Sequence, residues 1–225
     1  MTSTYFVAFL AVVLTGVATI AVRYLPRRLS VPFLIGLSIW LAYVAAMSWS
    51  GIVANPAFRP PAAFLVMLPA VLFIVFVLAL LPTGRRISIA FPVWLLVGAQ
   101  SFRVGVELLL HRLWTDGLVP RLMTYEGGNV DIFVGLSAPI IAWIATRGRI
   151  GLAVAQVWNV VGLAALANIV VRAALTAPGQ IKIIESEVPN LAIGTFPFTF
   201  IAAFLAPLAF ALHVLAIRAI RAKRG

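Results

Sequence analysis

Residues 62–82, AAFLVMLPAVLFIVFVLALLP, form an apolar run without a charged side chain. Because about 20 apolar residues in a helix cross the hydrocarbon core of a bilayer, this run predicts a membrane span. The rest of the chain has the same character: 63% of its 225 residues are hydrophobic, 10% are charged, and the mean hydropathy is +1.11. The composition therefore predicts an integral membrane protein rather than a soluble domain.

Further apolar runs of similar length lie on both sides of this one. Pro, Gly and charged residues separate them, as in SGIVANPAFRPP at residues 50–61. We predict an all-α, polytopic transmembrane bundle in a single domain, residues 1–225, with seven spans at 6–23, 31–50, 62–82, 88–113, 130–146, 150–177 and 191–217. No basic residue precedes the first span, so we expect a retained helix rather than a cleaved signal peptide.

The formal net charge of +11 is unevenly distributed along the chain. Basic residues without acidic neighbours occupy alternate loops and the C-terminal tail, namely Arg23, Arg27, Arg28, Arg85, Arg86, Arg147, Arg149, Arg218, Arg221, Lys223 and Arg224. The positive-inside rule assigns such loops to the cytoplasm, so we expect the N-terminus outside and the C-terminus inside. This topology accounts for the charge, and we expect the lipid bilayer, not nucleic acid, as the partner.

One span carries ionisable residues in the stretch QSFRVGVELLLHRLW, residues 100–114. Gln100, Arg103, Glu107 and His111 share one face of a helix, and Glu107 lies four residues from both Arg103 and His111, so it could pair with either. A single charge facing lipid at the bilayer centre would cost about 2.5 to 3.5 kcal/mol. The stripe must therefore face protein or water, either as a network that only holds helices together or as a polar pocket open to the outside.

Further polar residues lie at the same membrane depth. Asn168 and Arg172 belong to the sixth predicted span, and the loop WTDGLVPRLMTYEGGNVDIF, residues 114–133, follows the stripe directly. Asn129 or Asp131 of this loop could instead cap the next helix. We predict an outward-facing binding pocket formed by Arg103, Glu107, His111, Tyr125, Glu126, Asn129, Asp131, Asn168 and Arg172.

Position along the chain predicts where His213 and the segment 178–190 lie. A rise of about 1.5 Å per residue places His213 roughly 33 Å below the outer end of the last span, beside the cytoplasmic arginines and far from His111. The segment PGQIKIIESEVPN, residues 178–190, is either an extended flap over the pocket mouth or a solvated loop.

The stripe favours binding or transport of a small polar or anionic solute, with Arg103 and Arg172 as anion partners. The alternatives are a membrane enzyme acting on a lipid-like substrate, with His111 as base, and a structural subunit of a membrane complex. Glu107, His111 and Asp131 could offer three metal ligands, but the only two histidines are expected at opposite leaflets, so we predict no metal site. The absence of cysteine excludes thiolate chemistry. No cofactor can be assigned.

Three segments also carry a resemblance to known sequences: the stripe, MTYEGGNVDIFVGLSAPIIAW (residues 123–143) and WNVVGLAALANIV (residues 158–170). Over roughly residues 95–215 the chain resembles a group of uncharacterised bacterial multi-pass membrane proteins. The resemblance implies the bacterial inner (cytoplasmic) membrane, and it implies no substrate or site residue.

Overall fold

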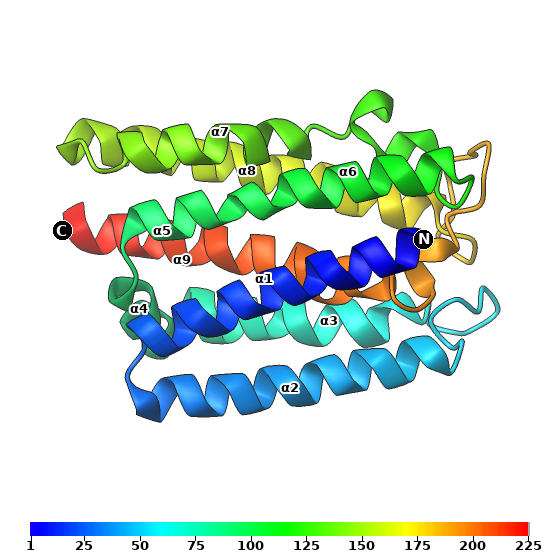
Figure 1. Ribbon diagram of the computed structural model, residues 1–225, viewed down its shortest axis with the longest axis horizontal. Coiled ribbons are helices and arrows are strands. Elements are labelled where there is room, and N and C mark those ends of the chain that lie inside the picture. The colour runs from blue at the N-terminus through cyan, green and yellow to red at the C-terminus, as the bar shows by residue number, and fades with distance from the viewer. Residues whose placement is uncertain (225) are drawn as a thin grey trace.

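The computed structural model describes residues 1–224, and these residues form a bundle of helices (Figure 1). The α-helices are α1 (Thr2–Tyr24), α2 (Arg27–Trp49), α3 (Ala63–Phe73), α4 (Pro82–Ala90), α5 (Val93–Gly98), α6 (Phe102–Thr115), α7 (Asp131–Ile144), α8 (Gly148–Thr176) and α9 (Ala206–Arg224). A π-helical segment, Ile74–Leu80, extends α3, and a second, Ile201–Leu205, leads into α9. A 3-10 turn, Ala99–Ser101, joins α5 to α6 into one rod.

Among residues 1–224, six helical rods are long and apolar enough to cross a membrane: Thr2–Tyr24, Arg27–Trp49, Ala63–Leu80, Val93–Thr115, Gly148–Thr176 and Ile201–Lys223. The fifth predicted span appears as α7, which packs between α6 and α8 but has only 14 residues. Its length of roughly 21 Å is below the hydrocarbon thickness of about 30 Å. The protein is thus a helical, multi-pass membrane protein, and the seventh crossing stays a prediction.

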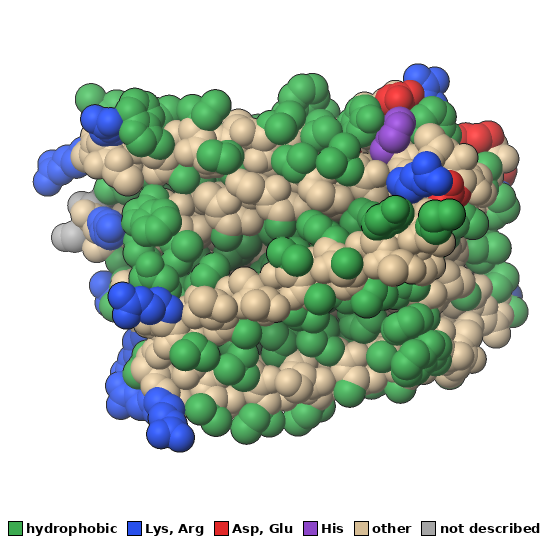
Figure 2. Space-filling view, in the orientation of Figure 1, with side chains coloured by type: hydrophobic (Ala, Val, Ile, Leu, Met, Phe, Trp, Pro, Cys, Tyr) green, Lys and Arg blue, Asp and Glu red, His purple; other side chains and the backbone are tan. Residues whose placement is uncertain are grey.

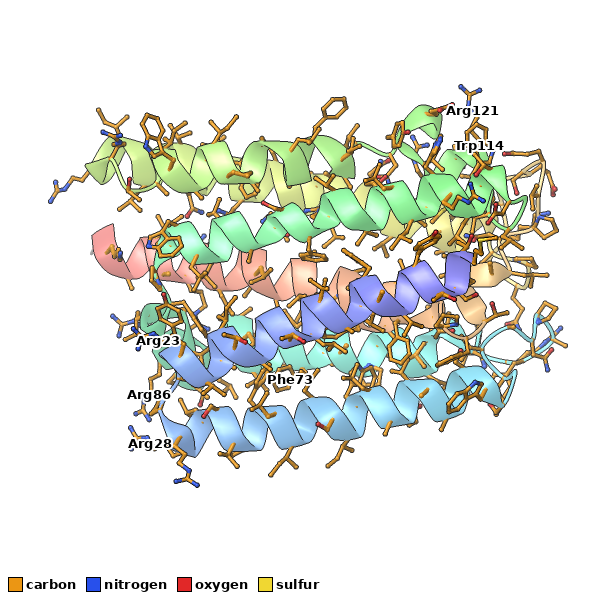
Figure 3. The ribbon with its side chains drawn as sticks, in the orientation of Figure 1. Arg23, Arg28, Phe73, Arg86, Trp114 and Arg121 are labelled. Atoms are coloured by element: carbon orange, nitrogen blue, oxygen red, sulfur yellow. The ribbon has the colours of Figure 1, made fainter. Side chains whose placement is uncertain are left out.

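The two ends of the bundle differ in charge. Figure 2 shows most of the Lys and Arg side chains of this face at one end, and acidic side chains, beside a few basic ones, only at the other. Arg23, Arg28 and Arg86 lie at the first end, and Trp114 and Arg121 lie at the second (Figure 3). The chain begins at the second end and finishes at the first (Figure 1). We call these the basic end and the acidic end.

Two predicted spans begin later in the chain than hydropathy indicated. Residues 82–90 form the separate short helix α4 at the basic end, so the fourth rod starts at Val93 rather than at residue 88. Residues 191–200 form turns, and the last rod starts at Ile201 rather than at residue 191. Arg103 and His213 consequently lie roughly 15 Å and 18 Å along their rods, each close to the middle of the bundle.

Side chains from neighbouring helices satisfy carbonyl groups that prolines leave free. Proline has no N–H, so the carbonyl four residues earlier loses its helical donor. Such carbonyls precede Pro69 and Pro207, and each has a substitute donor: Tyr43 Oη donates to Leu65 O (3.2 Å), and Trp40 Nε1 donates to Ala203 O (2.9 Å). At the end of the π-helical segment, where the helix stops at Leu80, Arg218 Nη1 donates to Leu78 O (2.7 Å). These bonds stabilise the irregular helices in an environment without water.

The apolar core has two parts, one toward each end of the bundle. Phe6, Val66 and Leu113 belong to the cluster at the acidic end, and Leu96 and Ile220 belong to the cluster at the basic end. The buried polar side chains described next lie where these two clusters meet.

Candidate functional site: a buried polar cluster below an apolar cavity

A chain of polar contacts links four helices in the middle of the bundle. Arg103 on α6 forms an ion pair with Asp131 at the start of α7, with its Nε also donating to Asp131 Oδ2 (3.2 Å). Arg103 Nη1 donates to His213 Nε2 on α9 (3.0 Å). Because arginine can only donate, His213 Nε2 accepts, and its Nδ1–H donates to Asn159 Oδ1 on α8 (2.8 Å). All four side chains are buried.

Two glycines allow these helices to approach each other. A Cβ on Gly162 of α8 would lie 2.4 Å from His213 Cε1, so the imidazole occupies space that any other residue would fill. Gly135 lies one helical turn beyond Asp131 on α7, and a Cβ at this position would lie 2.8 Å from the backbone nitrogen of Val104 on α6. The close approach of α7 to α6 brings Asp131 within reach of Arg103.

The position predicted for His213 was therefore wrong. This residue is fully buried in the polar cluster rather than placed at the cytoplasmic surface. The error came from starting the last helix at residue 191, which moved His213 ten residues too deep. With the rod starting at Ile201, His213 and Arg103 reach the same depth.

Glu107 lies one turn above Arg103 and has a different partner from those expected. Asn129 Nδ2 donates to Glu107 Oε1 (2.6 Å) and to Met123 O (3.1 Å). Asn129 Oδ1 accepts the backbone N–H of Asp131 (3.1 Å), the first residue of α7. The N-cap of this helix is Val130, which makes no side-chain cap, so neither Asn129 nor Asp131 is the N-cap. Within residues 1–224, Glu107 Oε2 has no hydrogen-bond partner, although the side chain is only 1% exposed. An unpaired buried oxygen of this kind is costly unless a ligand or water meets it.

The remaining predicted residues lie nearer the acidic end and form a separate group. His111 stacks on Tyr125 with ring centroids 4.9 Å apart, and its Nδ1 is 3.6 Å from Glu126 Oε1. Arg172 Nη1 donates to Gly127 O (2.9 Å), and its Nε donates to Asn168 Oδ1 (2.9 Å). These contacts hold the turn before α7 in place.

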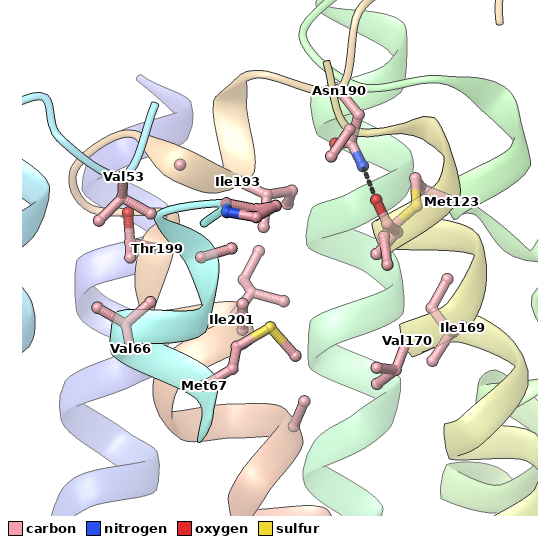
Figure 4. Close-up of a pocket in the computed structure, with 18 of the residues that line it drawn as sticks. Val53, Val66, Met67, Met123, Ile169, Val170, Asn190, Ile193, Thr199 and Ile201 are labelled. Carbon is pink, nitrogen blue, oxygen red and sulfur yellow. Dashed lines mark hydrogen bonds between the residues drawn. The ribbon is translucent and has the colours of Figure 1, made fainter. Parts of the chain in front are cut away.

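Beside Glu107 lies a cavity of about 340 Å³ (Figure 4). Val66, Met67 and Ile201 stand on one side of it, and Ile169 and Val170 of α8 face them. Most of the wall is apolar, and of the nine predicted site residues the cavity touches three: Arg103, Glu107 and Asp131. The structure thus places charged groups only at the inner part of a largely apolar cavity, and the polar side chains of Asn55, Gln180, Asn190 and Thr199 also line it.

The loops at the acidic end also border this cavity. Residues 53–56 and 177–181 both line it, and Gln180 Nε2 of the second loop donates to Phe58 O near the first (2.9 Å). Part of the segment 178–190 therefore lies at the cavity mouth. Farther along the same segment, Lys182 pairs with Glu185 at the exposed surface.

Sequence reasoning missed two contributors to this site. Asn159 lies in the sixth predicted span nine residues before Asn168, nearer the middle of the membrane, and this depth is the signal that could have found it. His213 was left out of the predicted site because the last helix was predicted to start at residue 191 rather than at Ile201. Within the described residues, no three His, Asp or Glu side chains are grouped as a metal site.

Comparison with known proteins agrees with a membrane bundle of unassigned activity. The fold and the buried cluster define a helical integral membrane protein. A family described as a domain of unknown function, DUF8737, matches residues 60–221, and the chain belongs to that family. No curated protein and no solved structure matches the chain.

Proposed function

We propose that this protein binds a lipid-like molecule in the cavity between α3, α6, α8 and the start of the last rod. The observation that carries the proposal is the unpaired, buried oxygen of Glu107 at the inner part of a largely apolar cavity. Ligand pockets commonly combine apolar walls with a few placed polar groups and have volumes of about 300 to 1,000 Å³. An amphipathic molecule would match both the apolar walls and the polar group of Glu107.

The rim of the cavity supports entry from the membrane. Phe64 and Leu68 on α3 line the cavity while remaining 43% and 49% exposed, so they stand at its edge on the outer surface of the bundle. In a membrane this surface contacts lipid tails. A molecule dissolved in the bilayer would reach the cavity past these two side chains.

The contacts of the two expected anion-binding arginines weigh against a small anionic solute. Arg103 is neutralised by Asp131, and Arg172 directs its donors to Gly127 O and Asn168. Arg172 does not appear among the cavity-lining residues of the described chain. His111 does not line the cavity either, so the acid–base role considered for it has no support from the geometry.

The proposed setting is the inner membrane of a bacterium, with the basic end in the cytoplasm. The separation of basic and acidic ends supports this orientation through the positive-inside rule. Termini at opposite ends of the bundle require an odd number of crossings, so we propose α7, with the turns before it, as the seventh. The cavity then belongs to the outer half of the membrane.

Filling the cavity tests the proposal. Val170→Trp places a large side chain in the cavity, whereas Val171→Trp alters the neighbouring residue, which is 53% exposed and does not line it. Native mass spectrometry of the purified proteins should detect a lipid-like ligand on wild type and on Val171→Trp but not on Val170→Trp. Equal occupancy in all three proteins would contradict binding in this cavity. An empty wild type, folded and purified in mild detergent, would favour a structural role for the polar network.

A further inference from the structure

We infer that the ligand of this cavity carries a hydrogen-bond-donating head group without negative charge, an alcohol or an amine, which Glu107 receives. The inference rests on the proposed function, because it assigns chemistry to the molecule that the cavity holds. It depends on three features of the described residues: the unpaired oxygen of Glu107, the balance of charge around it, and the apolar lining of the cavity.

The free atom at the site is a carboxyl oxygen, which accepts hydrogen bonds when the group is ionised and also donates one when it is protonated. Asn129 occupies Glu107 Oε1, and Oε2 stands without a partner among residues 1–224 in a side chain that is 1% exposed. A carboxylate oxygen accepts hydrogen bonds from O–H or N–H groups. An alcohol or an amine can donate and accept, so it satisfies this buried oxygen in either protonation state and removes the cost of leaving it unpaired.

The charge balance excludes an excess of positive charge at the inner part of the cavity. Arg103 is the only basic residue among the cavity-lining residues that the structure describes, and Asp131 pairs with it at close range. Asp131 and Glu107 are both carboxyl groups on the same wall. A phosphate or carboxylate head group would meet these acids without a free cation, and burying an unpaired charge is strongly unfavourable.

The lining of the cavity suits an apolar tail. It includes Ile169 and Val170 of α8 and the exposed Phe64 and Leu68 of α3, as well as Glu107. With the head group at Glu107, a tail would pass between α3 and α8 toward the lipid. The loops at the mouth contribute mainly small or apolar residues such as Val53, Ala54 and Pro56.

A competition between probes with one tail and different head groups tests the inference. Delipidated wild-type protein is mixed with equimolar hexadecanol, hexadecylamine, hexadecanoate and hexadecyl phosphate, and the adducts are separated by mass in native mass spectrometry. We expect the alcohol or the amine to exceed both anions by about ten- to a hundredfold, the effect of one buried hydrogen bond to a charged group. The relative yields of the hexadecanol and hexadecylamine adducts show whether the protein prefers the alcohol or the amine.

Variants show whether Glu107 determines the preference for one head group over another. Glu107→Gln keeps the shape but changes the acceptor, and the preference over the anions should fall by at least about tenfold. Glu185→Gln removes an exposed carboxylate at the same end of the bundle and should leave the preference unchanged. Because the wild-type ratio needs no variant, the test holds even if Glu107→Gln fails to fold.

The outcomes separate this inference from the proposed function. Anion adducts that equal or exceed the others, and that disappear in Val170→Trp, would overturn the inference while the cavity still binds lipid. An unchanged preference in folded Glu107→Gln would also overturn the inference. Adducts that persist in Val170→Trp, or none with any probe, would overturn both.

Discussion

Arg103 Nη1 on α6 lies 3.0 Å from His213 Nε2 on α9, so one hydrogen bond joins residues 110 positions apart in the chain. The same guanidinium is paired with Asp131 on α7. Three helices therefore meet at one arginine in the middle of the bundle. This arrangement makes the stability of the fold depend on the balance of charge at that point.

Removing the acid should destabilise the protein strongly. Asp131→Ala leaves the guanidinium of Arg103 buried without its counterion, which costs about 3 to 5 kcal/mol in the free energy of unfolding. The double variant Arg103→Met, Asp131→Leu replaces the pair with apolar side chains and should recover most of that loss. Unfolding in mixed micelles measures both values. Equal stability of Asp131→Ala and wild type would contradict the pairing.

The packing of His213 against Gly162 gives a second test. Gly162→Ala places a methyl group where the imidazole lies, 2.4 Å from Cε1, and should cost about 1 to 3 kcal/mol through overpacking. Gly36→Ala is the matched control, because its Cβ would meet nothing within 4 Å. Thermal unfolding should separate the two variants. A Gly162→Ala protein as stable as the control would show that His213 lies elsewhere.

The hydrogen bond between Trp40 and Ala203 can be tested by a double-mutant cycle. Trp40→Phe leaves the Ala203 carbonyl without its donor and should cost about 1 to 3 kcal/mol. Pro207→Ala restores a backbone N–H four residues later, so the same Trp40→Phe change should cost less in that background. Purely additive effects would mean that the indole does not replace the donor missing at Pro207.

Acid should loosen the segment 178–190. The backbone N–H of Arg121 donates to Glu187 Oε1 (2.5 Å), and this bond lowers the pKa of the Glu187 carboxyl from its usual value. Its contribution to docking is therefore complete above the unfolded-state pKa and is lost as the pH falls through the lower folded-state pKa. The protection factor of the Arg121 amide, which corrects the exchange rate for the pH dependence of intrinsic exchange, should fall at acidic pH in wild type and be low at every pH in Glu187→Gln. A protection factor that is independent of pH in wild type would contradict the contact.

Single cysteines can test the orientation, since the chain has none of its own. Ala57 and Thr83 are exposed at the acidic and basic ends respectively. In intact cells a membrane-impermeant maleimide should label Ala57→Cys and spare Thr83→Cys, which should react only after permeabilisation. The reverse pattern would invert the proposed topology.

The sequence predicted the helical segments better than their contacts. Long apolar runs such as residues 62–82 predicted a rod that the structure places at Ala63–Leu80, because length and hydropathy alone define such a segment. The same criterion failed at residues 191–200, where apolar side chains line turns rather than a helix. Hydropathy does not distinguish these cases, and the resulting shift misplaced His213.

The site was predicted in part. The helical spacing of Arg103 and Glu107 correctly put them on one buried face, and the loop after the stripe supplied Asn129 and Asp131. Which acid would pair with Arg103 could not be read from spacing, because the pairing depends on how closely α7 approaches α6 at Gly135. The apolar cavity was not foreseen, since its wall combines segments from residue 53 to residue 209.

An experimental density map of the protein in a lipid bilayer tests the central claim most directly. The account predicts elongated density in the cavity, with one end within hydrogen-bonding distance of Glu107 Oε2 and the other between Phe64 on α3 and Val170 on α8. A cavity closed by its own side chains, with Glu107 Oε2 bonded to a protein donor, would contradict it.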